Sequence, residues 1–428
     1  MSRSVGPDRF AESEAWWERA QRVIPLGTQT LSKSPTQFVQ GAHPIFIERG
    51  RGAHLFDVDG NEWIDEPMAL GPIVLGYADP VVDEAIRRQL EAGITFTLMH
   101  HLEVEVAERI VELCPGVEAV RFAKTGSDVL SGAVRAARAG TGRDVVLVAG
   151  YHGWHDWYIG TTTRRLGVPE AVTALVREFH FNDLEHLESC LTGLRGRVAA
   201  VVLEPAAAEV PEPGFLEGVV ELAAAHGAWS VFDEVITGFR LAPGGARERY
   251  GVIPDLSCYG KALGNGMPIS AVAGGWSAMR WFEEVFFSGT HGGEALSLAA
   301  AAAVLDTVAD GRVLKEIEAR GERLLDGLRR SIGHHGVEHL VRVGGEPHRG
   351  VVGFAGEDPL VTKSWVQQCQ AEHGCLFNGS LFICARHTDA DVDRMLEGFD
   401  RAFAVLAAGE DVGRHLVGPA VTPVFRTP

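Results

Sequence analysis

The stretch AAVVL at residues 199–203 and the stretch WSVF at residues 229–232 decide the fold, because each is apolar along its whole length. Four further short runs are largely apolar: residues 120–123, 144–149, 256–259 and 269–273. Helix-length segments separate these runs between about residue 70 and residue 310. Apolar strands that alternate with helices are typical of a parallel sheet covered on both faces. We therefore predict an α/β fold with a large, mainly parallel α/β/α sheet domain.

The rest of the chain is organised around this domain, which we expect at residues 70–310. The run HLFDVDGNEWID at residues 54–65 has two alternating segments around Asp59-Gly60, which predicts a hairpin. Residues 1–69 are then an N-terminal arm and hairpin that we expect to pack with a smaller domain. Residues 311–428 form that smaller α+β domain, and they begin with a helix-period pattern of leucines and isoleucines.

The charge and the cysteines narrow the possible partners and the compartment. A net charge of −18 repels phosphate backbones and anionic lipid heads, so we expect no nucleic acid and no membrane partner. The longest apolar run, at residues 298–305, is far shorter than the roughly 20 residues that cross a bilayer. The six cysteines are scattered without a C-x-x-C pair, as reduced thiols are. We expect a cytoplasmic protein without a signal peptide.

Polar residues directly after the apolar runs are the candidate site, because ligands of open α/β sheets collect at the carboxyl ends of strands. The first group is KTGSD at residues 124–128, which precedes a helical pattern. Gly126 allows close backbone approach, and Ser127 adds a hydroxyl at a helix start suited to a phosphate. The alternative is a simple helix start with Ser127 as the N-cap.

Two ionisable residues follow later runs. Asp233 ends the apolar run WSVFD, where a carboxylate needs a cationic or hydrogen-bonding partner such as a protonated pyridine nitrogen. Lys261 lies among glycines after the run LSCY, where a lysine can act as an amine nucleophile. The alternatives are a capping aspartate and a solvated surface lysine.

The loop YHGWHD at residues 151–156 offers an aromatic ring that could lie flat on a planar ligand. It also offers a different interpretation, since His152, His155 and Asp156 are metal-ligand types at close spacing. A metal-dependent hydrolase is therefore a distant alternative, and a cofactor-binding dimer with a structural role is a non-enzymatic one. Because a short loop would have to turn all three side chains inward, we predict no metal site.

Taken together, these motifs resemble the class III aminotransferases of fold type I, which use pyridoxal 5′-phosphate (PLP). The resemblance is to the glutamate-1-semialdehyde aminomutase-like branch. DVDGNEWID, GPIVLGYADP, TGSD, YHGWHD, VVLEP, FDEVITGFR, YGKALGNGMP and SGTHGGEALS occur in the order of that family. The similarity is close from Pro25 to Ala302 and looser in the last third of the chain.

The resemblance implies a role for each matching residue. Lys261 is the Schiff-base lysine and Asp233 the partner of the pyridine nitrogen, and these two are the expected catalytic residues. The expected cofactor contacts are Gly126 and Ser127 at the phosphate, Tyr151 on one ring face with His152 beside it, Val235 on the other face, and Thr290 at the phosphate of a neighbouring subunit. The implied active unit is a homodimer with shared active sites.

The substrate side departs from the aminomutases. Thr30 and Lys33 stand where that branch carries a serine and a carboxylate-binding arginine, and Leu70 replaces a tryptophan. Lys33 cannot form a bidentate fork with a carboxylate. Asn378 lies where the family has an acidic residue, and Glu209 lies where related enzymes place a glutamate near the cofactor's phenolic oxygen. Exposure in a loop is the alternative for Glu209.

The arm motif TLSK at residues 30–33 together with MALGP at residues 68–72 resembles aminotransferases that act on sugar or aminoglycoside aldehydes in polysaccharide or antibiotic biosynthesis. We expect a PLP-dependent aminotransferase that moves an amino group from glutamate or glutamine to the carbonyl of a sugar-like or aminoglycoside-like substrate. The alternative within the same fold is an aminomutase or an epimerase.

Overall fold

The computed structural model describes residues 9–423, and the chain folds into two compact units. The large unit contains Gly71–Val74 and Pro80–Lys315. The small unit contains the described residues up to Leu70, Leu75–Asp79, and the described residues from Glu316 onward. The chain therefore leaves the small unit and returns to it twice, and each unit is described by itself below.

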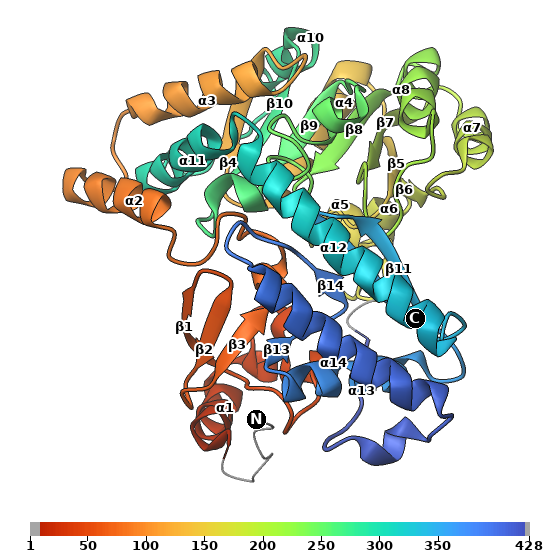
Figure 1. Cartoon of the computed structure of the whole chain (residues 1–428). Coiled ribbons are helices and arrows are strands. Elements are labelled where there is room, and N and C mark those ends of the chain that lie inside the picture. Colours follow the sequence, from red (N-terminus) through yellow and green to blue (C-terminus); the bar gives the residue numbers. More distant parts are fainter. Residues whose placement is uncertain (1–8, 424–428) are drawn as a thin grey trace. The chain divides into compact units, whose positions relative to one another are not determined.

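The large unit is built on a seven-stranded sheet in the order β4-β10-β9-β8-β7-β5-β6 (Figure 1). The strands are β4 (Ala119–Ala123), β5 (Val145–Ala149), β6 (Val176–Glu178), β7 (Val198–Leu203), β8 (Trp229–Glu234), β9 (Leu256–Tyr259) and β10 (Ser270–Gly274). All neighbours are parallel except β10, which is antiparallel to both β4 and β9. The predicted α/β fold with a mainly parallel sheet is confirmed. The three-residue strand β6 is too short to give an apolar signal in the sequence.

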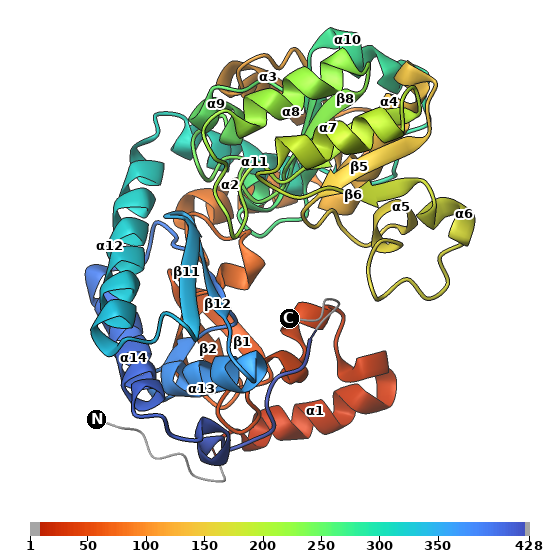
Figure 2. The same cartoon turned by 90° about the vertical axis from the view of Figure 1, so that its right-hand side faces the viewer.

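Helices cover both faces of this sheet. They are α2 (Pro80–Ala92), α3 (His101–Leu113), α4 (Gly126–Thr141), α5 (Asp156–Ile159), α6 (Glu170–Thr173), α7 (Leu184–Gly193), α8 (Phe215–Ala225), α9 (Ala246–Tyr250), α10 (Trp276–Met279) and α11 (Ala295–Val308). One buried cluster joins α4 and α10 to the sheet, and a second joins α7 and α8 to its opposite face (Figure 2). Neighbouring residues of one strand serve both clusters, as Val201 and Val202 of β7 do. Complete burial of such a side chain contributes about 1.5–3 kcal/mol, which explains why the strands are apolar on both faces.

The small unit joins the N-terminal and C-terminal parts of the chain. Its four-stranded sheet has the order β1-β2-β3-β13, with β1 (Ile47–Arg51), β2 (His54–Asp57), β3 (Glu62–Asp65) and β13 (Cys375–Leu376). Strands β2 and β3 form the hairpin predicted around Gly60, and β13 pairs in parallel with β3. A second sheet has the order β11-β12-β14, with β11 (Val341–Glu346), β12 (Arg349–Phe354) and β14 (Ser380–Leu381).

The helices of the small unit are α1 (Ala11–Val23), α13 (Pro359–Glu372) and α14 (Asp389–Ala407). Helix α12 (Arg312–His335) begins in the large unit and continues into the small unit. It is the amphipathic helix that the sequence predicts after Gly311. Short 3-10 turns complete the chain: Pro25–Gly27, Leu31–Lys33, Pro35–Gln37, Met68–Leu70, Lys261–Gly264, Arg280–Glu283 and Val412–His415. Within residues 9–423, no helix combines the length and the apolar character needed to cross a bilayer.

Candidate active site

The carboxyl ends of five strands share one edge of the large sheet. Strands β5, β7, β8 and β9 are parallel, and β4 runs in the same direction because β10 is antiparallel to both β4 and β9. The loops after Ala123, Ala149 and Tyr259 therefore leave the sheet at the same edge at which Asp233 lies. This topology gathers the motifs KTGSD, YHGWHD and YGK although more than 100 residues separate the first from the last.

Asp233 and His152 form a buried pair at this edge. Asp233 is 4% exposed, and its Oδ2 lies 2.8 Å from Nδ1 of His152, which is fully buried. The other carboxylate oxygen of Asp233 accepts a hydrogen bond from the backbone N–H of Val235 at 3.1 Å. A buried carboxylate is costly unless it is partnered, and these two contacts meet that need.

Nε2 of His152 is buried and has no hydrogen-bond partner among the described residues. The ring packs edge-on against Tyr158 at 5.2 Å between centroids and parallel to Trp157 at 6.4 Å. Unsatisfied buried polar atoms are uncommon in folded proteins. This nitrogen is therefore available to a polar group of a bound ligand.

The start of α4 forms a close-packed cradle. A Cβ atom on Gly126 would lie 2.9 Å from Cγ2 of Val235, and one on Gly153 would lie 2.2 Å from Oγ of Ser127, so neither position admits a side chain. Ser127 is buried in the first turn, and its Oγ accepts a hydrogen bond from the N–H of Trp154 at 3.2 Å. The first backbone amides of α4 also point outward from the helix end, as in anion sites.

The N-cap of α4 is Thr125, and the alternative interpretation of Ser127 as the cap is wrong. Oγ1 of Thr125 accepts a hydrogen bond from the N–H of Asp128, and the Asp128 carboxylate accepts one from the N–H of Thr125. This reciprocal capping box places the N-cap one residue before Gly126, the first residue of α4. Ser127 is thereby left in the first turn with its hydroxyl toward the YHGWHD loop.

Tyr151 lies beside this cradle in the loop after β5. Its backbone N–H donates to Oε2 of Glu204 at 3.2 Å, and its ring meets the edge of Tyr158 at 5.6 Å. Burial raises the pKa of the Tyr151 hydroxyl, and the charges of Asp233 and Glu204 raise it further. The ring is 42% exposed, so one side of it can meet a ligand. Glu204, in the VVLEP motif, holds the backbone of Tyr151 through this hydrogen bond, a role that the sequence did not predict.

Lys261 begins a short 3-10 turn two residues after β9, the strand beside the one that carries Asp233. Asp233 is paired with Cys258 across these strands. Lys261 has a backbone φ of +40°, in the left-handed region that residues other than glycine rarely adopt. Backbone conformations of this kind cost about 1–3 kcal/mol and cluster at functional sites. The turn ends at Asn265, whose Oδ1 accepts a hydrogen bond from the N–H of Val74 at 2.9 Å.

Thr290 and Glu209 lie in exposed loops of the large unit. Thr290 lines a cavity of about 470 Å³ together with Lys124 and His155. The ion pair between Lys124 and Glu294, at 2.9 Å, fixes the start of α11 just beyond Thr290. Glu209 is exposed, as its alternative interpretation predicts.

The remaining predicted substrate residues belong to the small unit. Lys33, Leu70 and Asn378 line a pocket of about 370 Å³ that Asp65 and Tyr77 also line. Thr30 is exposed at the start of a neighbouring 3-10 turn. Sequence reasoning missed Asp65 and Tyr77, although Asp65 ends the motif DVDGNEWID and Tyr77 lies within GPIVLGYADP.

The three residues of the metal alternative do not come together. Nδ1 of His152 is bound to Asp233, and Nδ1 of His155 lies 2.7 Å from Oγ of Ser131. Asp156 starts α5 and is exposed. Among residues 9–423, only His180, Asp183 and His186 form a group of three or more closely placed metal-ligand side chains.

Comparison with known proteins agrees with this geometry. Residues 37–358 match the family described as "Aminotransferase class-III". The chain belongs to the class III aminotransferases. It is 38% identical over 343 residues to the glutamate-1-semialdehyde 2,1-aminomutase of Syntrophobacter fumaroxidans (strain DSM 10017 / MPOB), covering 76% of this chain and 79% of that protein.

Two further relatives cover nearly the whole chain. The 3-aminobutyryl-CoA aminotransferase of Cloacimonas acidaminovorans (strain Evry) is 32% identical over 416 residues, which are 92% of this chain and 97% of that protein. The FumI protein of Sphingopyxis sp. MTA144, whose structure was solved in a PLP form, superposes with a TM-score of 0.87 at 29% identity, covering 95% and 100% of the two chains. This class III aminotransferase is thus a PLP-dependent enzyme of fold type I.

The residues of the large unit fit PLP. The glycine positions Gly126 and Gly153 leave a cradle that side chains would fill, at a helix start suited to a phosphate. The buried Asp233 carboxylate suits a protonated ring nitrogen, and the unpartnered His152 Nε2 suits a polar group on the ligand. The donor set of the site therefore agrees with the cofactor of the family.

Proposed function

We propose that this enzyme transfers an amino group from a small amino donor, glutamate or glutamine, to the carbonyl of a sugar-like or aminoglycoside-like acceptor. The observation that carries the amino-transfer chemistry is the buried pair of Asp233 and His152 beside the strand that leads to Lys261. When bound, PLP supplies an electron sink for the carbon that loses its proton. The protein's contribution is to hold charge and move protons around it.

Each candidate site residue of the large unit has a proposed task in this reaction. The Asp233 carboxylate accepts a hydrogen bond from the ring N–H and keeps that nitrogen protonated, while Nδ1 of His152 holds the carboxylate in place. The amine of Lys261 first anchors the cofactor. Once a substrate amine has taken its place, the Lys261 amine would remove a proton from the substrate Cα as a general base and deliver it to C4′ of the cofactor as a general acid. Tyr151 and Val235 enclose the two ring faces.

The phosphate end is proposed to lie at the start of α4. Gly126 allows the backbone amides to approach, and Ser127 adds its hydroxyl. Thr290 is proposed to reach the phosphate of a neighbouring subunit. Its exposure and its position in the wall of a cavity leave it accessible to a second chain.

A homodimer is the proposed active unit, and an apolar surface of the large unit supports it. Exposed apolar side chains gather in the segment before α3 and on α3 itself: Ile94 42%, Phe96 45%, Leu98 83%, Met99 78%, Val104 51% and Val111 37% exposed. The cavity of about 870 Å³ beside α3 is lined by three of them and by residues 288, 289, 292 and 293, which flank Thr290. Contiguous apolar surface of this kind marks protein interfaces.

The acceptor is proposed to bind in the pocket of the small unit. Its polar wall comprises Ser32, Lys33, Asp65, Tyr77 and Asn378, and its apolar wall includes Phe38 and Leu70. Several hydroxyl, amine and carboxylate groups beside an aromatic ring suit a polyhydroxylated or amino-substituted ring. Lys33 supplies a single point charge, which favours such an acceptor over one held by a bidentate carboxylate contact.

The second candidate function is the aminomutase reaction, in which the amino group moves within one substrate. The observation in its favour is the 38% identity to a glutamate-1-semialdehyde 2,1-aminomutase. The departures at Lys33, Leu70 and Asn378 count against it. A cytoplasmic location is also proposed, since the six cysteines are free thiols, as in reducing compartments.

The test has two stages. The PLP absorption band of the purified enzyme should respond to glutamate or glutamine with release of the free keto acid, and Lys261→Ala should remove this response while the fold survives. A screen of oxidised sugars, aminoglycoside aldehydes and glutamate-1-semialdehyde, followed by mass analysis of the products, then assigns the acceptor. Conversion of glutamate-1-semialdehyde without an external donor supports the second candidate. A protein that binds no PLP contradicts both.

A further inference from the structure

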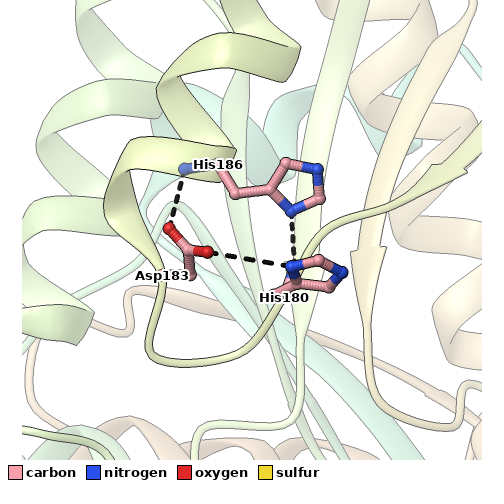
Figure 3. Close-up of side chains that lie close together, drawn as sticks. All are labelled: His180, Asp183 and His186. Atoms are coloured by element: carbon pink, nitrogen blue, oxygen red, sulfur yellow. Dashed lines mark hydrogen bonds and ion pairs between the residues drawn. The ribbon is translucent and has the colours of Figure 1, made fainter.

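Three metal-ligand side chains converge where the loop after β6 meets α7, and none of them belongs to the residues proposed to hold the cofactor. They are His180, Asp183 and His186, with the spacing H-x-x-D-x-x-H (Figure 3). One candidate ligand atom from each residue lies within 4.8 Å of those of the other two. Among residues 9–423, no other group of three or more histidine, cysteine, aspartate or glutamate side chains has this geometry.

Hydrogen bonds fix the backbone of this loop and thereby the positions of the candidate ligands. Asn182 has φ +60°, and its side chain bridges two residues of another loop: Nδ2 donates to the carbonyl of Val210 at 3.0 Å, and Oδ1 accepts from the N–H of Glu212 at 2.9 Å. Asp183 is the N-cap of α7, with Oδ1 accepting from the N–H of His186 at 2.8 Å. A site that is placed by backbone contacts needs little reorganisation to bind.

Several lone pairs of the group remain available to a cation. Asp183 uses Oδ1 for the helix cap, while its Oδ2 lies 3.7 Å from Nδ1 of His180, beyond a hydrogen bond (Figure 3). The two imidazole rings lie 4.1 Å apart between centroids at an angle of 39°. Nδ1 of His186 accepts a hydrogen bond from the backbone N–H of His180 at 3.1 Å, so His186 must either release this bond or ligate through Nε2.

We propose that His180, Asp183 and His186 bind one divalent transition-metal ion of the Zn²⁺ or Ni²⁺ class. Two imidazoles and one carboxylate match the ligand preference of these borderline ions, whereas Mg²⁺ and Ca²⁺ prefer all-oxygen sites. Three protein ligands leave at least one position to water. The ion ties the end of β6 to the start of α7, and Asn182 extends this tie to the segment that contains Val210 and Glu212. Because one hydrogen bond competes with ligation, we expect weaker binding than at a closed four-ligand site.

The experiment titrates chelator-treated, PLP-loaded enzyme with ZnCl₂ and NiCl₂ by calorimetry. We expect one saturable site per chain, with affinity reduced about tenfold or more in His180→Ala and in His186→Ala. Asp183→Asn separates the two tasks of that residue, because asparagine still caps a helix but carries no charge. It should weaken metal binding while the circular dichroism and the PLP absorption band stay unchanged.

The matched control is His334→Ala/His335→Ala, which removes another adjacent histidine pair near a carboxylate, that of Asp400. It should leave the affinity unchanged. A site that persists at full affinity in the double variant His180→Ala/His186→Ala overturns the proposal, and so does a wild-type protein without saturable binding. Equal affinity in Asp183→Asn overturns the role of the carboxylate and with it the three-ligand site.

Discussion

Two pairs of adjacent carboxylates end buried strands in this molecule, and their surroundings differ. In the large unit, Asp233 is partnered by His152, and Glu234 accepts hydrogen bonds from the N–H of Ala246 and from Ser257 Oγ at 3.2 Å. The fully buried Arg247 lies 3.9 Å from Glu234. In the small unit, Asp65 is hydrogen-bonded, but both carboxylate oxygens of the buried Glu66 lack a partner among the described residues.

The partners of these buried carboxylates therefore differ between the two units. Burial raises the pKa of Asp65 to about 6, although hydrogen bonds from Tyr77 and Ala69 oppose the shift. Burial raises the pKa of Glu66 well above its usual value, and the charge of Asp65 raises it further. A buried carboxylate stays ionised only where the fold supplies opposite charge or donors. Asp233, Glu234 and Asp65 have such donors, whereas Glu66 has none among the described residues.

The largest effect is expected for Asp233→Asn. Asparagine can still contact His152 but cannot hold a proton on the PLP ring nitrogen, so kcat for amino transfer should fall by about 10²–10³-fold, as when one preorganised electrostatic contact is removed. Steady-state kinetics at saturating donor measure this, and the PLP band checks that the cofactor is retained. An Asp233→Asn enzyme with kcat within about threefold of wild type, far less than the loss of such a contact produces, would remove Asp233 from the proposed site.

The neighbouring change Glu234→Gln should act on stability instead. It leaves the buried guanidinium of Arg247 without its carboxylate, so the free energy of unfolding should drop by about 3 kcal/mol. Urea unfolding measures the loss. The comparison with Asp233→Asn is sharp because the two residues are adjacent. If Glu234→Gln leaves unfolding unchanged and Asp233→Asn destabilises, the division of tasks between the two carboxylates is wrong.

Glu66→Gln should stabilise the protein, and the gain should grow with pH. The folded state keeps the Glu66 proton that the unfolded chain releases above its usual pKa of 4.5, so wild-type stability declines as pH rises above that value. Glutamine carries no such proton. Between pH 5 and pH 6.5 the difference in unfolding free energy should grow with pH, by at most about 1.4 kcal/mol per pH unit while the folded state keeps the proton.

Urea unfolding of wild type and Glu66→Gln at both pH values tests this expectation. The exposed Glu48 of β1 provides the control, because Glu48→Gln should show no pH-dependent difference. A constant difference for Glu66→Gln across this range would mean that Glu66 is ionised in the folded protein.

The sequence predicted the large unit better than the small one, for physical reasons. Runs that are apolar on both faces identify the strands of a covered parallel sheet, and strand direction then places Asp233 and Lys261 at one edge. The pairing of Asp233 with His152 joins residues 81 positions apart, and no local pattern encodes it. The true cap Thr125 could have been found, since Thr-x-x-Asp is a capping-box spacing.

In the small unit the decisive features are invisible to periodicity. Met68, Ala69 and Leu70 have φ of +42°, +56° and +74°, and nothing in their residue types predicts a left-handed turn. The parallel pairing of β13 with β3 joins segments more than 300 residues apart. The raised pKa of Glu66 depends on burial by such distant segments, so no local pattern indicates that this acidic residue is internal.

The smallest effect is expected for Tyr77→Phe, which removes the hydrogen bond of 2.5 Å from the Tyr77 hydroxyl to Oδ2 of Asp65. The same oxygen accepts from the N–H of Ala69 at 3.2 Å, in the middle of the left-handed turn, so the pair helps to hold a backbone that is strained at three successive residues. At pH 8 the loss of a bond to an ionised acceptor should lower the free energy of unfolding by about 1.5 kcal/mol. Below about pH 6 Asp65 is protonated, so the loss at pH 5 should be smaller.

Urea unfolding at the two pH values, with Asp65→Asn and the double variant completing a cycle, measures the coupling. Equal losses at pH 5 and pH 8 would show that the charge of Asp65 does not stabilise this turn. The difference between the two carboxylate pairs would then rest on Glu66 alone.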